Sequence, residues 1–424
     1  MERRVKVNID RIMIPIAKIQ EARANLAEVV IKSPFTRNIN LSEKYGCDIF
    51  LKREDMQLVR SFKIRGAYNK INNISLEDRP KGIVCASAGN HAQGVAYACA
   101  HLGIKGKIFM PNPTPNQKIN KVRLFGKEFV EVVLVGDTYD DAYIAALEDE
   151  KKSGSTFIHP FNDEEVIAGQ GTIAAEILDQ TNVPLDYILV AVGGGGLISG
   201  ISSYFKALSP HTKIIAVEAE GAPAMKTSID AKKIKRLDKI ETFADGIAVK
   251  EVGDLTFSIC KELVDDFILV PEGKICSTIL SLYNDEAIVV EPAGAISISA
   301  LDQIADLIKG KQVAIVVCGG NNDIQRTSEI HERALLHEGR KHYFIIKFPQ
   351  RAGALRDFLN VLGPDDDISH FQYTKKNNRN NGPALVGLEL KDPNDFKSLL
   401  QRMEAQNINY QHINNNPMLF EMFV

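Results

Sequence analysis

Nine short runs of strand-forming residues, separated by helical stretches, occupy the chain between about residue 45 and residue 337. They are DIFLKRE (48–54), GIVCAS (82–87), GKIFMP (106–111), FVEVVLVG (129–136), STFIHP (155–160), YILVAVG (187–193), KIIAVEA (213–219), DFILVP (266–271) and QVAIVVCGG (312–320). Because they are nearly continuous in apolar residues, they are typical of parallel strands that are buried on both faces. The pattern predicts an α/β protein. Nine strands are too many for one comfortable doubly wound sheet, so we expect two lobes with a ligand-binding cleft at strand carboxyl ends.

The pattern changes after about residue 340, where six shorter segments follow one another. They are KHYFIIKFP (341–349), GALRDFLNVL (353–362), ISHFQYTKK (368–376), ALVGLELK (384–391), PNDFKSLLQRMEAQ (393–406) and NYQHI (409–413). Their order predicts βαββαβ, a ferredoxin-like arrangement. We therefore expect an α/β region over 1–338, with its smaller lobe at approximately 50–160, and a separate small domain over 339–424.

Composition narrows the classes of ligand. The 51 basic and 54 acidic residues leave no positive field for nucleic acid or an anionic membrane surface, so small molecules and proteins are the expected partners. The six cysteines form no C-x-x-C pair and indicate reduced thiols. No apolar run approaches the length of a membrane span, and MERRVKVNIDRIM lacks the apolar part of a secretory leader, which favours a cytoplasmic protein. No metal-ligating cluster of His, Cys and carboxylates stands out.

Four consecutive glycines, Gly193 to Gly196, lie between a predicted strand and a predicted helix. Glycine weakens regular elements, so such a run is kept where the backbone must approach something closely. Its N–H groups and the following helix N-terminus form an anion cradle suited to a phosphate. Two alternatives stay open. A dinucleotide fingerprint would need a glycine where Ser199 stands, with Glu218 as the ribose-binding acid, and a purely structural turn needs no ligand.

Two further loops carry candidate ligand-binding groups. In SFKIRG (61–66), Lys63 stands at the mouth of a predicted helix, although a surface lysine that extends its ammonium into water is the ordinary alternative. ASAGNHAQG (86–94) is a strand-to-helix junction whose free amides near Gly89, Asn90 and His91 can hold a carboxylate. A simple N-cap would explain the same residues.

The last two loops place polar groups at the cleft. Cys318 ends a predicted strand, where its side chain can reach into the cleft or merely fill space. Glu291 precedes a proline that can start a helix, which also fits a glutamate that complements the helix dipole. Together these loops offer four features: a phosphate cradle, a carboxylate-binding helix end, an isolated lysine and a polar group at a strand end. Pyridoxal phosphate (PLP) fits all four.

Four motifs resemble those of a known family: SFKIRGA (61–67), SAGNHAQG (87–94), GGGGL (193–197) and EPAG (291–294). In this order and spacing they resemble the fold-type II PLP-dependent enzymes, and closely the biosynthetic threonine dehydratases, also called threonine ammonia-lyases. The resemblance covers nearly the whole chain and includes a C-terminal ACT-like regulatory domain.

The resemblance implies roles for individual residues. Lys63 would be the catalytic lysine that binds PLP covalently, Phe62 the aromatic beside the cofactor, and Asn90 the donor to its 3′-oxygen. Glu291 would also contact the cofactor. The phosphate loop would consist of Gly193, Gly194, Gly195, Gly196 and Leu197. The substrate carboxylate would lie against Ser87, Ala88, Gly89, Asn90 and His91.

Cys318 would face the pyridine nitrogen. A neutral partner makes the ring a weaker electron sink, which favours loss of a β-leaving group over racemisation or transamination. Related racemases carry a second serine where this chain has Ala88. Since alanine cannot exchange a proton, racemisation is disfavoured.

The implied reaction converts L-threonine to 2-oxobutanoate and ammonia, the entry step to isoleucine biosynthesis. L-Serine is an alternative substrate. The alternative functions are a catabolic-type or serine-preferring dehydratase, a dinucleotide-binding oxidoreductase and a non-catalytic amino-acid sensor. Isoleucine, and with it valine, is the implied effector. It would bind at Gln350, Arg351, Ala352, Gly353, Ala354 and Leu355, where relatives have proline instead of Ala352; a ligand-free dimerisation module is the alternative. The protein is expected to be a homo-oligomer, either a dimer or a tetramer.

Overall fold

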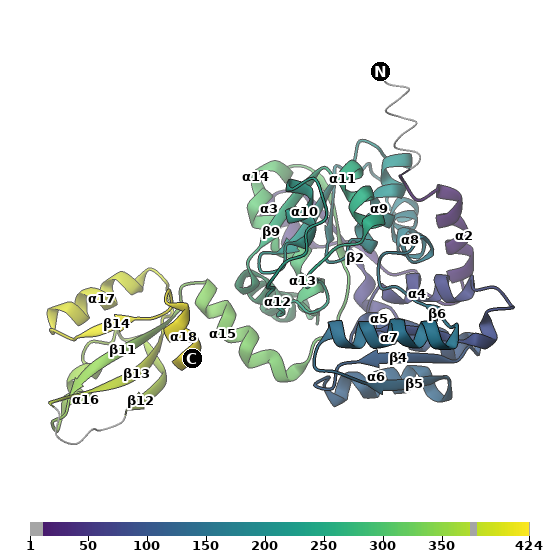
Figure 1. The fold of residues 1–424 in the computed structure, drawn as a ribbon. Coiled ribbons are helices and arrows are strands. Elements are labelled where there is room, and N and C mark those ends of the chain that lie inside the picture. The colour runs from purple at the N-terminus through teal and green to yellow at the C-terminus, as the bar shows by residue number, and fades with distance from the viewer. Residues whose placement is uncertain (1–11, 374–379, 424) are drawn as a thin grey trace. The chain divides into compact units, whose positions relative to one another are not determined.

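The computed structural model describes residues 12–373 and 380–423. These residues form two compact units (Figure 1). The first contains residues up to 272 together with 282–323, and the second contains 273–281 together with 324–424. None of the helices within the described ranges is both long and apolar enough to cross a membrane.

The larger sheet of the first unit has six strands in the order β1-β2-β10-β7-β8-β9. The strands are β1 (Phe35–Arg37), β2 (Asp48–Arg53), β7 (Tyr187–Ala191), β8 (Lys213–Ala219), β9 (Asp266–Val270) and β10 (Gln312–Val317). All neighbours run parallel except β1, which pairs antiparallel with β2. The short β1 was not predicted.

The smaller sheet has four parallel strands in the order β5-β4-β3-β6. They are β3 (Ile83–Ala86), β4 (Gly106–Met110), β5 (Val130–Leu134) and β6 (Thr156–Phe157). All nine predicted runs therefore contain a strand, and the predicted α/β class with two sheets is confirmed. Parallel strands buried by helices must be apolar on both faces, and the four residues of β3 are indeed all buried.

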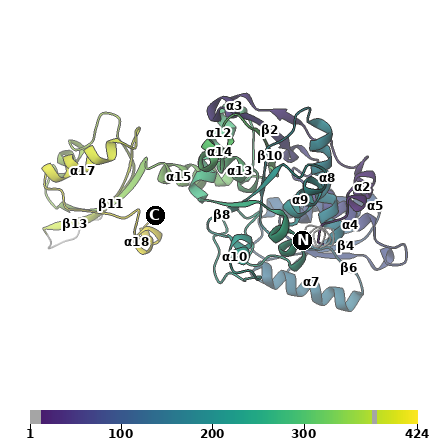
Figure 2. The same cartoon turned by 90° about the horizontal axis from the view of Figure 1, so that it is seen from above.

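Helices connect and cover the strands of both sheets. Those of the first half are α2 (Ile16–Leu26), α3 (Ile39–Tyr45), α4 (Lys63–Asn72), α5 (Asn90–Leu102), α6 (Asn116–Gly126), α7 (Tyr139–Ser153), α8 (Glu164–Gln180) and α9 (Gly196–Leu208). Later in the chain come α10 (Ala224–Asp230), α11 (Asp254–Leu263), α12 (Glu272–Glu286), α13 (Pro292–Ser299) and α14 (Ala305–Ile308). Figure 2 shows α8 and α9 side by side, in close contact.

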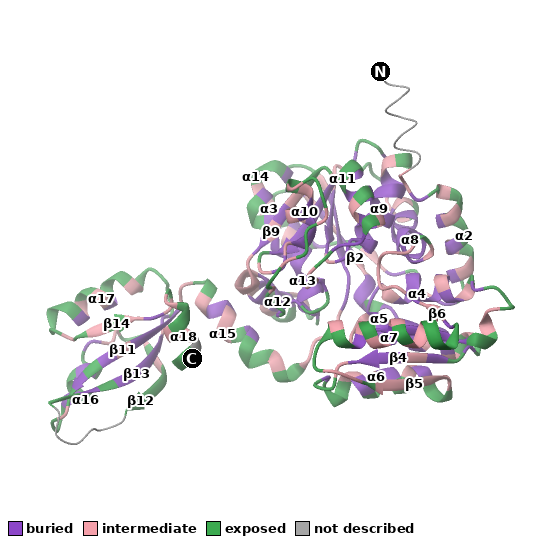
Figure 3. Ribbon diagram, in the orientation of Figure 1, coloured by how far each residue is buried: buried purple, intermediate pink, exposed green. Residues whose placement is uncertain are grey.

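Helix α4 is held on two sides, which fixes the position of its first residue. One side packs Ile64 and Tyr68 into the apolar cluster of the smaller sheet and α5. The other side lies so close to α8 that a Cβ atom on Gly66 would be 2.6 Å from the carbonyl oxygen of Val166. Buried residues dominate this region in Figure 3. Lys63 begins α4, so its backbone is set by contacts with both neighbours.

The second unit contains α15 (Thr327–His337), β11 (Lys341–Pro349), α16 (Ala354–Leu359), β12 (Asp367–Tyr373), β13 (Asn381–Glu389), α17 (Asp395–Ala405), β14 (Tyr410–His412) and α18 (Pro417–Phe423). Its antiparallel sheet has the order β12-β13-β11-β14, which confirms the predicted βαββαβ domain. Helices α15 and α18 were not predicted. An apolar core that includes Phe344, Phe358 and Leu399 holds the helices on the sheet.

Candidate active site

The site forms around the half-buried amine of Lys63 in the first turn of α4. Its Nζ atom donates a hydrogen bond to the carbonyl oxygen of Pro160 at 3.0 Å. The ring of Phe62 lies below the same nitrogen, with its centroid at 5.3 Å. The amine therefore has one fixed hydrogen-bond acceptor and an aromatic face beside it.

The glycine loop lies next to the segment that accepts this hydrogen bond. A Cβ atom on Gly194 would overlap the ring of Phe161, and one on Gly196 would lie 3.0 Å from its Cα atom. Since Pro160 and Phe161 are adjacent, one short segment contacts both Lys63 and the loop. The structure thus brings together two motifs that are about 130 residues apart in the sequence.

The loop itself presents main-chain donors. Gly195 has φ +90°, a left-handed conformation that favours glycine, and it precedes the first residue of α9. Within the described residues, no protein acceptor pairs with the N–H groups of Gly193, Gly194 or Gly195. The first-turn N–H groups of α9 lack helical partners for geometric reasons. These donors suit a phosphate group.

Gly194→Ala should weaken cofactor binding by about tenfold or more, because the added methyl group forces Phe161 and the loop apart at a typical overpacking cost of 1–3 kcal/mol. Fluorescence titration of the apoenzyme with PLP measures this. Gly89→Ala is the matched control, because a Cβ atom there meets nothing within 4 Å. It should keep the cofactor affinity and raise the KM for threonine; equal cofactor losses in both variants would contradict the assignment.

Burial lowers the pKa of Lys63 from 10.5 to about 8, although the charges of Cys318 and Glu291 oppose the shift. The two histidines nearby, by contrast, have pKa values far below neutral pH. Burial lowers the pKa of His91 to about 3 and that of His159 to about 4, so both rings are neutral at pH 7. Lys63 can thus exchange a proton near neutral pH, whereas the two histidines cannot.

Asn90, the first residue of α5, donates from Nδ2 to Oε1 of Glu291 at 2.6 Å. Burial, with a smaller contribution from the charge of Asp245, raises the pKa of this carboxyl to about 7, and the hydrogen bond from Asn90 opposes the shift. Cys318 donates its thiol hydrogen to the carbonyl oxygen of Ala293 at 3.0 Å, and burial holds its pKa well above 9.0. The thiol is therefore neutral.

The loop after β3 forms the predicted helix end. Ser87 Oγ accepts a hydrogen bond from the N–H of Gly89 at 3.2 Å, and Gly89 precedes α5. The first N–H groups of α5, at Asn90 and His91, point out of the helix N-terminus. Together with the open space beside Gly89, this gives room and donors for a carboxylate. The His91 ring itself is occupied by the carbonyl oxygen of Ile158 at 2.9 Å.

The sequence analysis missed the role of the segment 159–162. His159 Nδ1 accepts hydrogen bonds from the N–H groups of Phe161 and Asn162 at 3.2 and 2.8 Å, which folds the segment into a tight turn. Asn162 in turn accepts from the N–H of Leu255, at the start of α11, at 3.1 Å. The rule that parallel strands carry ligand groups at their carboxyl ends could have found it, because the turn follows β6.

The predicted effector loop, Gln350 to Leu355, follows β11 in the second unit. Arg351 forms an ion pair with Asp357 at 2.6 Å, and both side chains are exposed. Gly353 has φ +84° and precedes α16. Nε2 of Gln350 is buried and has no hydrogen-bond partner in the described part of the chain. The described contacts of the loop do not identify a ligand.

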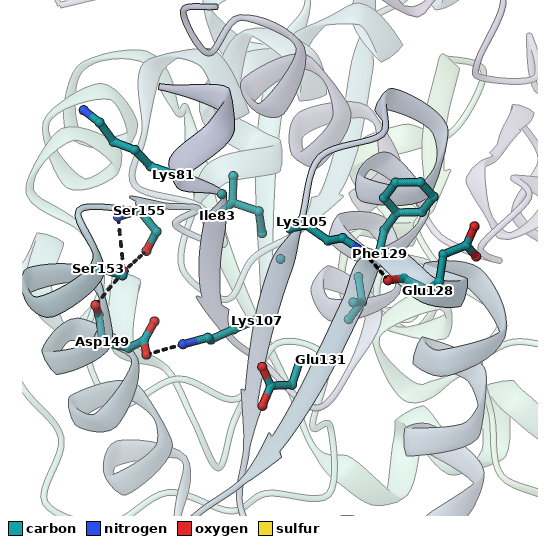
Figure 4. A pocket seen from close by; sticks show the side chains of 13 residues that line it. Lys81, Ile83, Lys105, Lys107, Glu128, Phe129, Glu131, Asp149, Ser153 and Ser155 are labelled. Carbon is teal, nitrogen blue, oxygen red and sulfur yellow. Dashed lines mark hydrogen bonds and ion pairs between the residues drawn. The ribbon is translucent and has the colours of Figure 1, made fainter. Parts of the chain in front are cut away.

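An open pocket of about 410 Å³ lies where the strands of the smaller sheet begin, at the end of the sheet away from Ser87 (Figure 4). It is lined by the residues at which β3, β4 and β5 begin, whereas Ser87 follows the carboxyl end of β3. Lys107 is paired there with Asp149 at 2.7 Å, and Lys105 donates to the carbonyl oxygen of Glu128 at 2.6 Å. Because these lysines already have partners, the pocket is not a competing candidate for the active site.

The residues present fit PLP. The unpaired main-chain donors of the glycine loop suit its phosphate, and the amine with a lowered pKa suits its aldehyde. A largely parallel two-sheet fold with these groups gathered after strand carboxyl ends defines the class of fold-type II PLP-dependent enzymes. Consistently, residues 26–319 match the sequence model of the family described as pyridoxal-phosphate dependent enzyme. The model described as the C-terminal regulatory domain of threonine dehydratase matches 332–423.

Similar proteins of known name show which branch of the PLP-dependent enzymes the chain belongs to. The chain is 55 % identical over 412 residues to L-threonine dehydratase biosynthetic IlvA of Halalkalibacterium halodurans, covering 97 % of this chain and 99 % of the relative. It is 54 % identical over 413 residues to the same enzyme of Bacillus subtilis, covering 97 % and 98 %. The chain belongs to the family of biosynthetic L-threonine dehydratases.

Two solved structures are similar to the first unit's fold. The processed form of threonine deaminase isoform 2 from Solanum lycopersicum has a TM-score of 0.72 and 40 % identity, over 75 % of this chain and 93 % of that one. Maize serine racemase has a TM-score of 0.70 and 33 % identity, over 76 % and 98 %.

Proposed function

We propose that this protein uses PLP to convert L-threonine to 2-oxobutanoate and ammonia as a biosynthetic threonine dehydratase. The observation that carries the proposal is the half-buried amine of Lys63, which has a pKa of about 8 and lies beside a glycine loop with free main-chain donors. The family membership supports the same substrate, because the relatives are named L-threonine dehydratases.

Each part of the site has a task in this reaction. The N–H groups at the start of α5 bind the substrate carboxylate, and the loop 193–197 binds the cofactor phosphate. Bound PLP supplies the electron sink that makes the Cα proton of the amino acid acidic. The free amine of Lys63 would be the base that takes that proton. An amine with a pKa of about 8 is partly neutral at pH 7, as a base requires.

Two neighbours set the outcome of proton removal. Cys318 stays neutral because its pKa is raised, so it places no negative charge beside the ring nitrogen. A weaker electron sink favours prompt loss of the β-hydroxyl group. Ala88 has no hydroxyl group that could return a proton to the opposite face of Cα, which separates this chain from a racemase.

Purified holoenzyme should release 2-oxobutanoate from L-threonine, detected by its hydrazone or by coupled reduction. L-Serine should be the poorer substrate, judged by kcat/KM. A native protein that lacks a visible cofactor band and forms no 2-oxoacid from either amino acid would overturn the proposal. Formation of D-allo-threonine from L-threonine, or of D-serine from L-serine, as the main product would assign it to the racemases instead.

The free amine of Lys63 gives a pH-dependent prediction for the apoenzyme. Covalent capture of PLP requires the neutral amine, whose fraction changes tenfold per pH unit below the pKa. The capture rate should rise tenfold per pH unit up to about pH 7 and level off above the pKa of about 8. Stopped-flow absorbance after mixing apoenzyme with PLP measures it. A rate that still rises tenfold per unit at pH 9 would mean an ordinary lysine with a pKa of 10.5.

The second unit is proposed to be a feedback sensor for isoleucine, with valine as a second ligand and the loop 350–355 as the binding segment. Its match to the regulatory-domain model supports this. Arg351→Ala should raise the isoleucine concentration for half-inhibition at least several-fold and leave kcat unchanged. Titrating the full-length enzyme with isoleucine tests it; an unchanged inhibition curve would remove Arg351 from the site, and no inhibition of native enzyme would remove the sensor.

A homo-oligomer, either a dimer or a tetramer, and a cytoplasmic location are also proposed. The edge strand β12 exposes Phe371 and Tyr373, a surface that a second copy can cover. The six cysteines are all buried and free, which suits a reducing compartment. Light scattering of the purified protein determines the oligomeric state.

A further inference from the structure

A chain of three side-chain hydrogen bonds connects helix α6 to Asn90. Nζ of Lys121 donates to Oδ1 of Asn321 at 2.9 Å, and Nδ2 of Asn321 donates to Oδ1 of Asn90 at 2.7 Å. Nδ2 of Asn90 donates to Oε1 of Glu291 at 2.6 Å. These hydrogen bonds cross between the lobes. Helices α5 and α6 belong to the lobe of the smaller sheet, whereas Asn321 follows strand β10 of the larger sheet and Glu291 precedes α13.

The ammonium at one end determines the orientation of both amides. Lys121 can only donate, so it must face the oxygen of Asn321. The Nδ2 group of Asn321 then donates to Oδ1 of Asn90 and also to the carbonyl oxygen of Val59 at 2.8 Å. Asn90 consequently turns its NH₂ group away from Asn321 and toward Glu291. One of its two hydrogens is used by the carboxylate, and the second is available to a ligand.

Lys121 is a half-buried cation whose described contacts include no carboxylate within ion-pair distance. Burial lowers its pKa, while the charge of Glu291 acts in the opposite direction. Arg60, Asp323 and Lys118 are the other charged groups that influence it. Holding a desolvated cation on an amide oxygen is costly, so the arrangement needs a reason other than stability.

We infer that Asn321 and Lys121 are positioning residues, which hold the amide of Asn90 so that its free N–H donates to the ring oxygen of the cofactor. This inference rests on the proposed function. A hydrogen-bonded chain that ends in a cation also polarises each member, so the N–H of Asn90 becomes a stronger donor. The ring oxygen is then stabilised as an anion, and the visible absorbance of the bound cofactor depends on that charge.

Two substitutions in the holoenzyme test the inference. Lys121→Met removes the cation and keeps the length of the side chain. Asn321→Asp keeps an acceptor for Lys121 but removes the donor to Asn90. In both variants the ring oxygen should take up a proton more readily, so part of the visible cofactor band moves to the near ultraviolet. The dissociation constant of PLP should rise at least threefold, and more for Asn321→Asp than for Lys121→Met.

Lys118→Met is the matched control. Lys118 lies nearly one turn earlier on α6, pairs with Asp245 at 2.6 Å, and also places a positive charge near Glu291. Its removal should leave the band and the PLP dissociation constant within twofold of native. An equal shift in this control would attribute the effect to general electrostatics and overturn the inference, as would native spectra and affinities in both test variants. If native enzyme binds no PLP, the proposed function fails instead.

Discussion

Lys63→Ala is expected to reduce threonine turnover by more than about 10⁴-fold, because one substitution removes both the covalent anchor of the cofactor and the base. The purified variant should also lose the visible band that survives gel filtration in the native enzyme. PLP should still bind reversibly, since the glycine loop that accepts its phosphate is unchanged. Absorbance before and after filtration separates the two modes of binding.

Two controls make the result specific to this amine. Lys70→Ala, on the same helix α4, removes an ion pair with Asp163 and should keep near-native turnover. Addition of a small primary amine to Lys63→Ala should restore a measurable part of the rate, because it replaces the missing base. Borohydride reduction of native holoenzyme should label the peptide that contains Lys63; labelling of another lysine would contradict the assignment.

The sequence predicted the elements of this fold better than their contacts. Parallel strands covered by helices are nearly continuous in apolar residues, so all nine runs could be found from the local sequence pattern. The run STFIHP shows what the pattern could not predict. Its strand, β6, ends at Phe157, and the last two residues of the run, His159 and Pro160, form part of the site instead. Local patterns cannot tell where a strand stops pairing, because that depends on its neighbour.

The site was predicted as five separate loops, and their pairings needed the structure. The motifs around Lys63, Asn90, Glu291 and Cys318 indicated one ligand because their chemistry was complementary. Nothing in the sequence pairs Asn90 with Glu291, which are 201 residues apart. Lys121 has no motif at all, since a lysine on an amphipathic helix is normally exposed. Its role depends on Asn321, which the fold brings to it from the other sheet.

Buried charges around α4 were also beyond prediction. Lys52 and Glu54, within and just after β2, belong to the run DIFLKRE, where charged residues would normally face solvent. In the structure Lys52 pairs with Glu176 at 2.6 Å. Arg65, two residues after Lys63, pairs with Glu54 at 2.8 Å and with Glu176 at 2.7 Å. Two cations and two carboxylates thus form a neutral, buried cluster.

Arg65→Met is expected to lower the free energy of unfolding by about 3–5 kcal/mol, because two buried carboxylates are left with one cation. Chemical denaturation of the apoenzyme, followed by circular dichroism, measures this change. Arg23→Met is the control: its ion pair with Asp179 is largely exposed and should contribute less than about 1 kcal/mol. A loss for Arg65→Met no larger than for Arg23→Met would show that the cluster is well solvated in solution.

The cluster also has a pH signature with a defined sign. Burial is the largest single effect and would raise the pKa of Glu54. The charge and hydrogen bonds of Arg65, with the charge of Lys52 and the hydrogen bond from Ser33, together outweigh it, so the pKa lies below 4.5. A carboxyl whose folded-state pKa is depressed contributes stability above its unfolded pKa and loses it as the pH falls through the folded value. The difference in stability between native enzyme and Arg65→Met should therefore shrink progressively below pH 4.5.

Combining Arg65→Met with Glu54→Gln should recover part of the lost stability, since the amide needs no counter-ion and Lys52 keeps its partner Glu176. Such a recovery would show that the single substitution is costly through uncompensated charge, as expected for buried ion pairs. Lost packing alone would make the double variant at least as unstable as Arg65→Met. Because Arg65 lies on the first turns of α4, a recovered fold with a weakened PLP band would further show that the cluster orients Lys63.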